Sequence, residues 1–163
     1  MLRVHIRFLL SAAVAVGSLF AEEFVGKVVA ITDGDTLKVL RAGTEVRVRL
    51  HGIDTPESRQ PFGRQAHQFV GDLAFGKMVT IIVRDHDRYR RLVVEVILPD
   101  GRSLNHELVR SGLAWWYRRY APTDKTLERL ENEARRARRG LWTDRSPVPP
   151  WEWRVGAKPV AAR

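Results

Sequence analysis

The first half of the chain alternates apolar and polar side chains in short segments, which is the pattern of β-strands. Residues 22–32 are rich in β-branched and apolar side chains and predict a first strand. Residues 36–40 and 46–50 alternate apolar with polar or cationic side chains, which predicts two strands with one buried face each. The dipeptides at 33–34 and 42–43 both end in glycine and are typical of tight turns. We therefore expect a three-stranded meander.

The second half adds helical periods and two further strands. Apolar side chains recur at helical spacing in residues 63–75, 103–110 and 127–141, which predicts three helices. Residues 78–83 and 92–98 predict two more strands. This order favours an α+β fold, a small closed or half-closed β-barrel of the OB kind with helices around it. The pattern alone leaves the choice between a barrel and an open sheet undecided.

The two ends of the chain differ from its body. Residues 1–21 combine a basic start with an apolar run at 8–20, which is the arrangement of a signal peptide. The run is short for a membrane span, and an uncleaved N-terminal anchor is the alternative. Residues 146–153 are too rich in proline for helix or strand, so we expect them to wrap against the body through their tryptophans. We interpret residues 22–153 as one domain and 154–163 as a flexible tail.

The composition limits which binding partners the protein can have and which chemistry its side chains can perform. The formal net charge of +9 favours a polyanionic partner, such as nucleic acid or an anionic envelope polymer. The chain has no cysteine, which excludes a disulfide, a thiolate metal site and a cysteine nucleophile. A bound metal would therefore be held by oxygen or histidine ligands. Together with the signal segment, these features predict an exported monomer, periplasmic or secreted, with no stable membrane association after signal cleavage.

One stretch, residues 33–57, concentrates the candidate chemistry. Asp35 follows the first turn, Arg49 lies in the third strand, and Asp54 and Glu57 come directly after it. If the strands pair as a hairpin and curl, the two groups of acids meet at one rim. Carboxylates beside an arginine suit both a divalent cation and a phosphodiester. The Asp-Gly-Asp-Thr sequence alone is typical of an ordinary hairpin turn, so this interpretation depends on the whole set.

Two later segments mix arginines with aromatic side chains. Residues 84–91 place Tyr89 among four arginines. A solvated loop is the simple interpretation of this segment, and contact with a phosphate backbone is the functional one. We expect Trp115 and Trp116 to pack in the core, as large aromatic side chains usually do. Tyr120 precedes an Ala-Pro loop and is the better candidate for substrate binding.

Five motifs, in this order along the chain, resemble the staphylococcal nuclease (thermonuclease) family. Each motif alone is weak, but five in register are specific, because independent turns and loops have no reason to follow this order. The resemblance covers residues 22–153. The motifs are DGDT at 33–36, RLHGIDTPE at 49–57, DRYRR at 87–91, LVRSGLAWW at 108–116 and RRGLW at 138–142.

The resemblance implies an OB-fold five-stranded barrel with three helices, and it assigns roles to the acid cluster. Asp35 and Asp54 would bind Ca²⁺ through their carboxylates, with the backbone carbonyl of Thr55 as a further ligand. Arg49 and Arg91 would bind the scissile phosphate. The implied reaction is hydrolysis of phosphodiester bonds in DNA and RNA without regard to the sugar or the sequence, leaving 3′-phosphates.

The remaining roles implied by the resemblance concern water and the substrate strand. Glu57 would orient or deprotonate the attacking water, and Asp33 would support the metal ligands. Tyr89, with Arg88 beside it, would contact a phosphate of the substrate. Tyr120 would stack near the nucleotide.

The sequence departs from the family pattern at three places. Arg90 takes the position of a glycine, so either Arg90 or Arg91 is the second phosphate-binding arginine; we favour Arg91 because strand residues 92–94 follow it directly. Arg118 takes the position of a tyrosine that contacts the nucleotide. The loop at 58–62 is short, which affects how a groove accepts a long substrate.

Three functions are compatible with these observations. The first is an exported, Ca²⁺-dependent nuclease, and the second is an OB-type module that binds nucleic acid without cutting it. The third, a cationic protein of the envelope, leaves the ordered motifs unexplained. The enzyme is favoured because all the residues that the chemistry requires are present. These residues are Asp35, Arg49, Asp54, Glu57 and Arg91.

Overall fold

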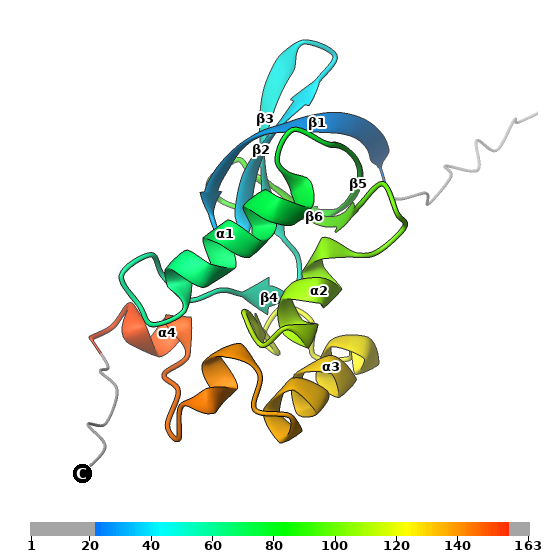
Figure 1. The fold of residues 1–163 in the computed structure, drawn as a ribbon. Coiled ribbons are helices and arrows are strands. Elements are labelled where there is room, and N and C mark those ends of the chain that lie inside the picture. The colour runs from blue at the N-terminus through cyan, green and yellow to red at the C-terminus, as the bar shows by residue number, and fades with distance from the viewer. Residues whose placement is uncertain (1–21, 157–163) are drawn as a thin grey trace, which may run out of the picture.

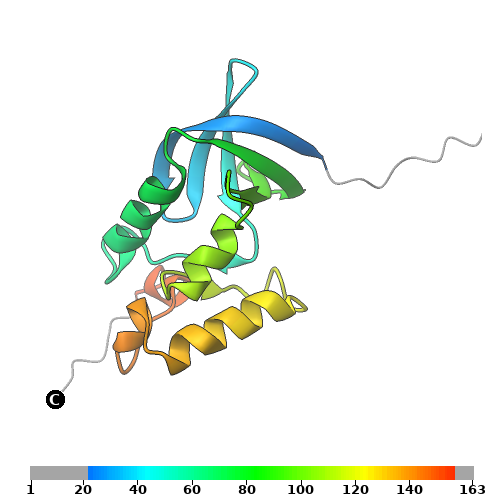
Figure 2. The same cartoon turned by 45° about the vertical axis from the view of Figure 1, so that its right-hand side comes forward.

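The computed structural model describes residues 22–156 (Figures 1 and 2). The expected signal peptide, residues 1–21, lies outside the described residues, as do residues 157–163 of the expected tail. Within 22–156, no helix combines the length and the apolar character that crossing a membrane requires.

Five strands close into a barrel in the order β1-β2-β3-β6-β5. Neighbouring strands are antiparallel except β3 and β6, which pair in parallel. The closed barrel confirms the expected OB-like architecture and decides between the barrel and the open sheet. The strands are β1 (Glu23–Asp33), β2 (Thr36–Arg41), β3 (Thr44–Leu50), β5 (Met78–His86) and β6 (Leu92–Ile97).

Strand β1 bends so that it can serve two neighbours. Its first half pairs with β5 and its second half pairs with β2. The register against β2 shifts after Val28 and again after Ile31, and such irregularities curve a strand. At Gly26 an added Cβ would overlap the Val39 side chain, so the close approach of β1 to β2 requires glycine there. The bend in β1 allows the sheet to close.

Three main helices accompany the barrel. Figures 1 and 2 show α2 and α3 beneath the barrel, at the end opposite the β2–β3 hairpin. Helix α1 packs against β1 and α2, and α2 packs against α3. Side-chain oxygens of Ser103 and Asp124 accept backbone N–H groups at the starts of α2 and α3, which satisfies donors that a helix leaves free. The helices are α1 (Gly63–Ala74), α2 (Leu104–Arg110) and α3 (Lys125–Arg136).

Helix α3 ends earlier than its apolar stripe predicts. The sequence pattern indicates a helix to residue 141, but the helix ends at Arg136 and Arg138 turns the chain with a φ of 49°. Leu141 lies instead in a short 3₁₀ turn, η1 (Gly140–Thr143). Its N–H donates to the carbonyl of Gly112 at 2.9 Å, a contact that a straight helix would not reach. The prediction was wrong because this tertiary contact outweighs the local helical pattern.

Two short strands connect the barrel to the helices. β4 (Ile53–Asp54) pairs antiparallel with β7 (Trp115–Trp116), and all four residues are buried. The burial of both tryptophans confirms that they pack in the core. Asp54 is the last residue of β4, and the helical side of the molecule covers this strand.

The last described element is held by aromatic packing. Contrary to expectation, the proline-rich segment contains one helical turn, α4 (Pro150–Trp153), because proline is tolerated where the first N–H of a helix has no partner. The ring of Trp151 lies 5.7 Å from that of Trp115 and stacks on Tyr117 with centroids 4.9 Å apart. The expected wrapping against the body is confirmed for Trp151.

Gly63 closes the loop that leads from the acid cluster into α1. A Cβ added there would overlap the carbonyl of Glu57, whereas a Cβ on Gly71 of the same helix meets no atom within 4 Å. We expect Gly63→Ala to lower the free energy of unfolding by about 1–3 kcal/mol, because the backbone must move apart. The matched control Gly71→Ala should raise the free energy of unfolding by up to about 1 kcal/mol. Urea unfolding of both variants measures the difference, and equal effects would contradict this account.

Candidate active site

The acid cluster forms where the β1–β2 turn meets the end of β3. Arg49 pairs in register with Thr36, directly after Asp35 in the turn. The N–H of Leu50 donates to the carbonyl of Asp35 at 2.9 Å, which fixes the turn against the end of β3. The N–H of Asp35 itself donates to the Asp33 carboxylate at 3.1 Å. Strand pairing therefore brings Asp35 and Arg49 together, as the sequence predicts.

Arg49 joins the two buried carboxylates. One guanidinium nitrogen, Nη1, donates to Asp35, and Nη2 donates to Oδ1 of Asp54 at 2.7 Å. Asp35 and Asp54 are 2% and 0% exposed, so their charges depend on protein partners rather than on water. Asp35 also accepts the N–H of Thr55 at 3.0 Å and the hydroxyl of Thr36 at 3.2 Å. The two acids are thus held rigidly on either side of one guanidinium.

Burial sets the protonation of Asp35 in the protein without a bound cation. It raises the pKa of Asp35 to about 7, because the loss of water outweighs the charge of Arg49 and the neighbouring acids Asp33 and Asp54 add to the rise. Arg49 is also deeply buried, which lowers its pKa, but the carboxylates of Asp35 and Asp54 more than compensate and raise the pKa of Arg49 above its ordinary value. A carboxyl that titrates near neutrality marks a site whose charge changes readily.

Glu57 stands at the rim of the cluster. Its side chain is 41% exposed, in contrast to the buried Asp35 and Asp54. Its backbone N–H donates to the side chain of Gln60 at 3.1 Å, and Gln60 in turn donates to the carbonyl of Val148 at 2.6 Å. This places a carboxylate beside the buried acids with access to solvent, which is the position that a group acting on water needs.

Arg91, rather than Arg90, reaches the cluster. Arg91 Nη1 lies 3.4 Å from the hydroxyl of Thr36, which bonds to Asp35, and its Nε donates to Asp87 at 2.7 Å. Arg90 is exposed and turns the chain with a φ of 62°, a conformation that glycine adopts without strain. This geometry agrees with the choice of Arg91 that we favour from the sequence. The left-handed backbone at position 90 also explains why the family pattern has a glycine there.

The two exposed tyrosines lie in different surroundings. Tyr89 is 61% exposed, accepts a hydrogen bond from Arg88 at 2.8 Å, and has the guanidinium of Arg91 at 5.4 Å from its ring centre. Tyr120 is 62% exposed and makes an edge-on contact with Tyr117. In residues 22–156 no hydrogen bond or ion pair joins either tyrosine to the acid cluster, but Tyr89 lies against Arg91, which reaches it.

Arg118, which takes the place of a tyrosine in the family pattern, has a structural partner. Its Nη2 lies 2.9 Å from Oε2 of the fully buried Glu131, and its guanidinium lies 4.2 Å from the ring centre of Trp116. Glu131 also accepts the N–H of Trp116 at 3.1 Å. The position therefore neutralises a buried carboxylate instead of facing the acid cluster.

Arg154 belongs to the site, although the sequence places it in a flexible tail. Its Nη2 lies 2.7 Å from Oδ2 of Asp54, and its Nη1 lies 2.7 Å from Oε1 of Glu57. These ion pairs hold the pKa of Arg154 above its ordinary value, although partial burial acts against the rise. The tryptophans just before it are the only signal in the sequence that the chain returns here.

The donor set suits a cation that prefers oxygen ligands. Among residues 22–156 no group of three or more histidine, aspartate or glutamate side chains is placed to hold a metal. Asp35 and Asp54 nevertheless supply two fixed carboxylates, and Thr55, which follows Asp54 and donates its N–H to Asp35, is also buried. Carboxylate and carbonyl oxygens are the ligands of Ca²⁺, which completes an irregular shell with water.

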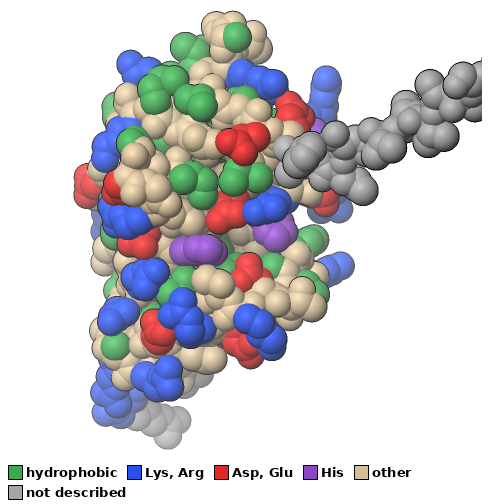
Figure 3. All heavy atoms as spheres, turned by 90° about the vertical axis from the view of Figure 1, so that its right-hand side faces the viewer, with side chains coloured by type: hydrophobic (Ala, Val, Ile, Leu, Met, Phe, Trp, Pro, Cys, Tyr) green, Lys and Arg blue, Asp and Glu red, His purple; other side chains and the backbone are tan. Residues whose placement is uncertain are grey.

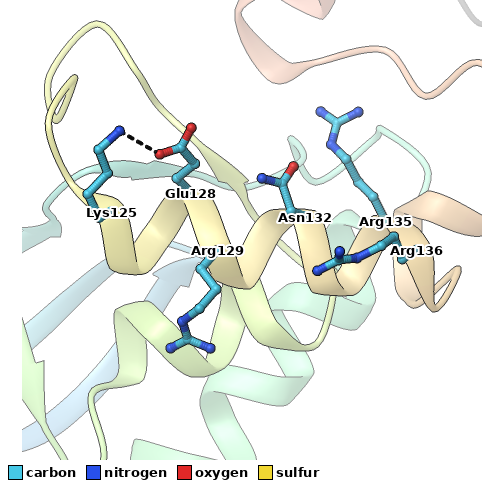
Figure 4. A pocket seen from close by; sticks show the side chains of 6 residues that line it. All are labelled: Lys125, Glu128, Arg129, Asn132, Arg135 and Arg136. Atoms are coloured by element: carbon cyan, nitrogen blue, oxygen red, sulfur yellow. Dashed lines mark hydrogen bonds and ion pairs between the residues drawn. The ribbon is translucent and has the colours of Figure 1, made fainter.

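Basic side chains also gather away from this site. Figure 3 shows one face on which Lys and Arg side chains collect in the lower part, at the height of the helices. Figure 4 shows a shallow hollow on α3 that shares no residue with the acid cluster. Four of its six residues are basic, as expected for a solvated helix face. They are Lys125, Glu128, Arg129, Asn132, Arg135 and Arg136.

Comparison with known proteins identifies the family. A model of the family described as staphylococcal nuclease homologue matches residues 47–144. An uncharacterized endonuclease of Escherichia coli O157:H7 is 46% identical over 129 residues, which are 79% of this chain and 84% of that protein. A micrococcal nuclease of Shigella flexneri is 43% identical over 145 residues, with 83% of each chain covered. The staphylococcal-like nuclease CAN1 of Arabidopsis thaliana is 42% identical over 66% of this chain and 33% of its own length.

The closed barrel with its acid–arginine cluster and these similarities define the same class of protein. The chain belongs to the staphylococcal nuclease family. It is a nuclease, that is, a hydrolase of phosphodiester bonds.

The raised pKa of Asp35 predicts a pH-dependent stability in the presence of a chelator. A carboxyl group whose pKa is raised on folding stabilises the folded state most below its ordinary pKa of 3.8, and the contribution is lost as the pH rises through about 7. Relative to Asp35→Asn, the wild-type protein should lose on the order of 2 kcal/mol between about pH 5 and about pH 8. Urea unfolding measures both profiles, and parallel profiles would show that Asp35 does not titrate in this range.

Proposed function

We propose that this chain is an exported, Ca²⁺-dependent nuclease that cuts DNA and RNA without sugar or sequence specificity. The observation that carries the proposal is the arrangement around Arg49. It lies between two buried carboxylates, with a solvent-accessible Glu57 beside them and Arg91 reaching the same turn. Few other reactions need two fixed acids, two arginines and a carboxylate facing water in one place.

The buried acids account for the metal requirement in this proposal. Asp35 and Asp54 would hold Ca²⁺ through their carboxylates, with the backbone carbonyl of Thr55 as a further ligand. When bound, the ion supplies neutralising charge at a phosphate oxygen. The hydrogen bonds from Arg49 and Thr55 fix the orientation of the two carboxylates before an ion binds.

The arginines account for recognition of the reacting phosphate. Arg49 and Arg91 each carry a guanidinium group, whose several N–H donors can bind the oxygens of a phosphate group in pairs, a geometry that lysine does not offer. Such an arginine contributes about 10³–10⁵-fold to the rate of phosphoryl transfer in other enzymes. Glu57, next to them, orients a water molecule and accepts its proton, which is worth roughly 10²–10⁴-fold. Attack of this water displaces the 5′ oxygen and leaves a 3′-phosphate.

The surface beside the cluster accounts for binding without base specificity. Tyr89, with Arg88 beside it, extends into solvent where a substrate strand would pass, and Tyr120 offers a second exposed ring. Rings that stack on bases and arginines that bind phosphates recognise any sequence. Binding should therefore weaken steeply with salt. We further propose that residues 1–21 direct export to the periplasm or the medium, where calcium is plentiful, and that the enzyme acts as a monomer.

The metal and the reaction are tested together in one assay. Purified protein is incubated with single-stranded DNA and, separately, RNA, with added CaCl₂ or with a calcium chelator. We expect fragments that end in 3′-phosphate only in the presence of calcium. Cleavage in the chelator would refute the metal assignment, and binding without cleavage in both conditions would favour the binding module instead.

The same assay includes Glu57→Gln as a matched variant. This substitution keeps the size of the side chain and removes the group that accepts the proton from water. It should retain substrate binding and lose most turnover, by roughly 10²-fold or more. Unchanged turnover would remove Glu57 from the reaction.

A neighbouring pair of arginines tests the second phosphate contact. Arg91→Ala should reduce kcat/KM by about 10³-fold, because a guanidinium beside Thr36 is lost. Arg90→Gly is the control, because it removes an adjacent exposed guanidinium and suits the left-handed backbone. It should retain activity and gain up to about 1 kcal/mol of stability. Loss of activity in Arg90→Gly alone would reverse the assignment.

A further inference from the structure

Arg154 reaches the candidate metal site from the opposite end of the chain. It follows α4 directly. Its Nη2 bonds to Asp54, which lies 100 residues earlier in the chain, and its Nη1 bonds to Glu57, which lies 97 residues earlier. We call residues 146–156 the C-terminal strap. The strap therefore places a positive charge beside Asp54, which is one of the two carboxylates that would bind calcium in the proposed function.

The strap is fixed to the body just before it reaches the site. The carbonyl of Val148 accepts a hydrogen bond from Gln60 at 2.6 Å. The ring of Trp151 stacks on Tyr117 and meets Trp115 edge-on. These anchors bring Arg154 within reach of Asp54, while its own side chain is 41% exposed and free to leave toward solvent.

Arg154 and Arg49 together occupy both oxygens of Asp54, and Arg154 Nη1 also lies 3.4 Å from Oδ1. Arg49 donates to Oδ1 at 2.7 Å, and Arg154 donates to Oδ2 at 2.7 Å. Both oxygens of this buried carboxylate are therefore bonded to guanidinium groups, and Oε1 of Glu57 is bonded to the second nitrogen of Arg154. A divalent cation held by Asp54 would have to share or replace one of these partners.

Charge makes calcium compete with the guanidinium groups that are bonded to Asp54. A calcium ion lies about 2.3–2.6 Å from its carboxylate oxygens. A guanidinium bonded to the same carboxylate would then lie within roughly 5 Å of a double positive charge, which is strongly unfavourable at a site so poorly solvated. The same repulsion acts on Arg49, but the Arg49 side chain is only 20% exposed and is also bonded to Asp35. The Arg154 side chain is 41% exposed and can exchange its partners for water. Arg154 is the partner that can leave.

We propose that Arg154 is a built-in competitor of calcium, so that the C-terminal strap closes the site when calcium is absent and is released from Asp54 when calcium binds. This proposal rests on the calcium dependence proposed above. It adds a regulatory role for a segment outside the five family motifs: the strap sets the calcium concentration at which the enzyme becomes active.

Calcium titration of Arg154→Gln tests the competition without relying on activity. The variant should bind CaCl₂ about fivefold or more tightly than the wild type in isothermal titration calorimetry, because no guanidinium has to be displaced. Arg145→Gln is the matched control, since it removes the same charge from an exposed position in the same part of the chain. The control should change the calcium affinity less than twofold, which separates displacement from a general change in net charge.

A second measurement follows the strap itself. Hydrogen exchange in residues 149–156 of the wild type should become faster on addition of CaCl₂, while exchange in β2 and β3 should not. In Arg154→Gln the same segment should exchange at a rate that calcium does not change.

The outcomes separate this proposal from the proposed function. If the wild type binds calcium and Arg154→Gln binds it equally or more weakly, the competition is refuted and the calcium-dependent nuclease stands. Unchanged exchange in the strap at saturating calcium would refute it in the same way. If neither protein binds calcium, the metal assignment fails and the competition fails with it.

Discussion

The buried ion pairs of Arg49 organise this molecule around one point. Asp35 comes from a turn, Asp54 from a short strand and Arg49 from the barrel wall, and the Arg49 guanidinium is the one partner that both buried carboxylates share. Removing one member of such a set leaves an uncompensated buried charge, which is costly. The site and the stability of this end of the barrel are therefore one structure rather than a reactive group added to an independent scaffold.

The parallel pairing of β3 with β6 extends this organisation to the second arginine. Val48 pairs with Leu92, so the start of β6 is held beside the end of β3 where Arg49 lies. Arg91 immediately precedes β6 and is thereby delivered to Thr36 and the acid turn. The short strands β4 and β7 contribute from the side of the helices. Their pairing holds Asp54 beside the buried Trp115 and Trp116.

Local patterns in the sequence predicted the elements well and the long-range contacts less well. The alternation of apolar and polar side chains predicted the strands, because this signal lies within a few neighbouring residues. The ordered motifs are equally local, and they predicted the site residues Asp35, Arg49, Asp54, Glu57 and Arg91. The closure of the barrel, the end of α3 and the return of Arg154 depend on contacts between distant segments. Neither the contact of Leu141 with Gly112 nor that of Arg154 with Asp54 leaves a periodic trace in the chain.

The pairing of β3 with β6 also has a consequence for how the protein folds. The meander of β1 to β3 consists of local contacts, but the parallel pair joins residues separated by α1 and β5. Such pairings carry a large loop-closure entropy and form late in folding. Because Arg91 arrives with this pair, the local meander alone places Asp35 beside Arg49 without the second arginine. The complete reaction centre therefore requires the pairing of β3 with β6 across this long stretch of chain.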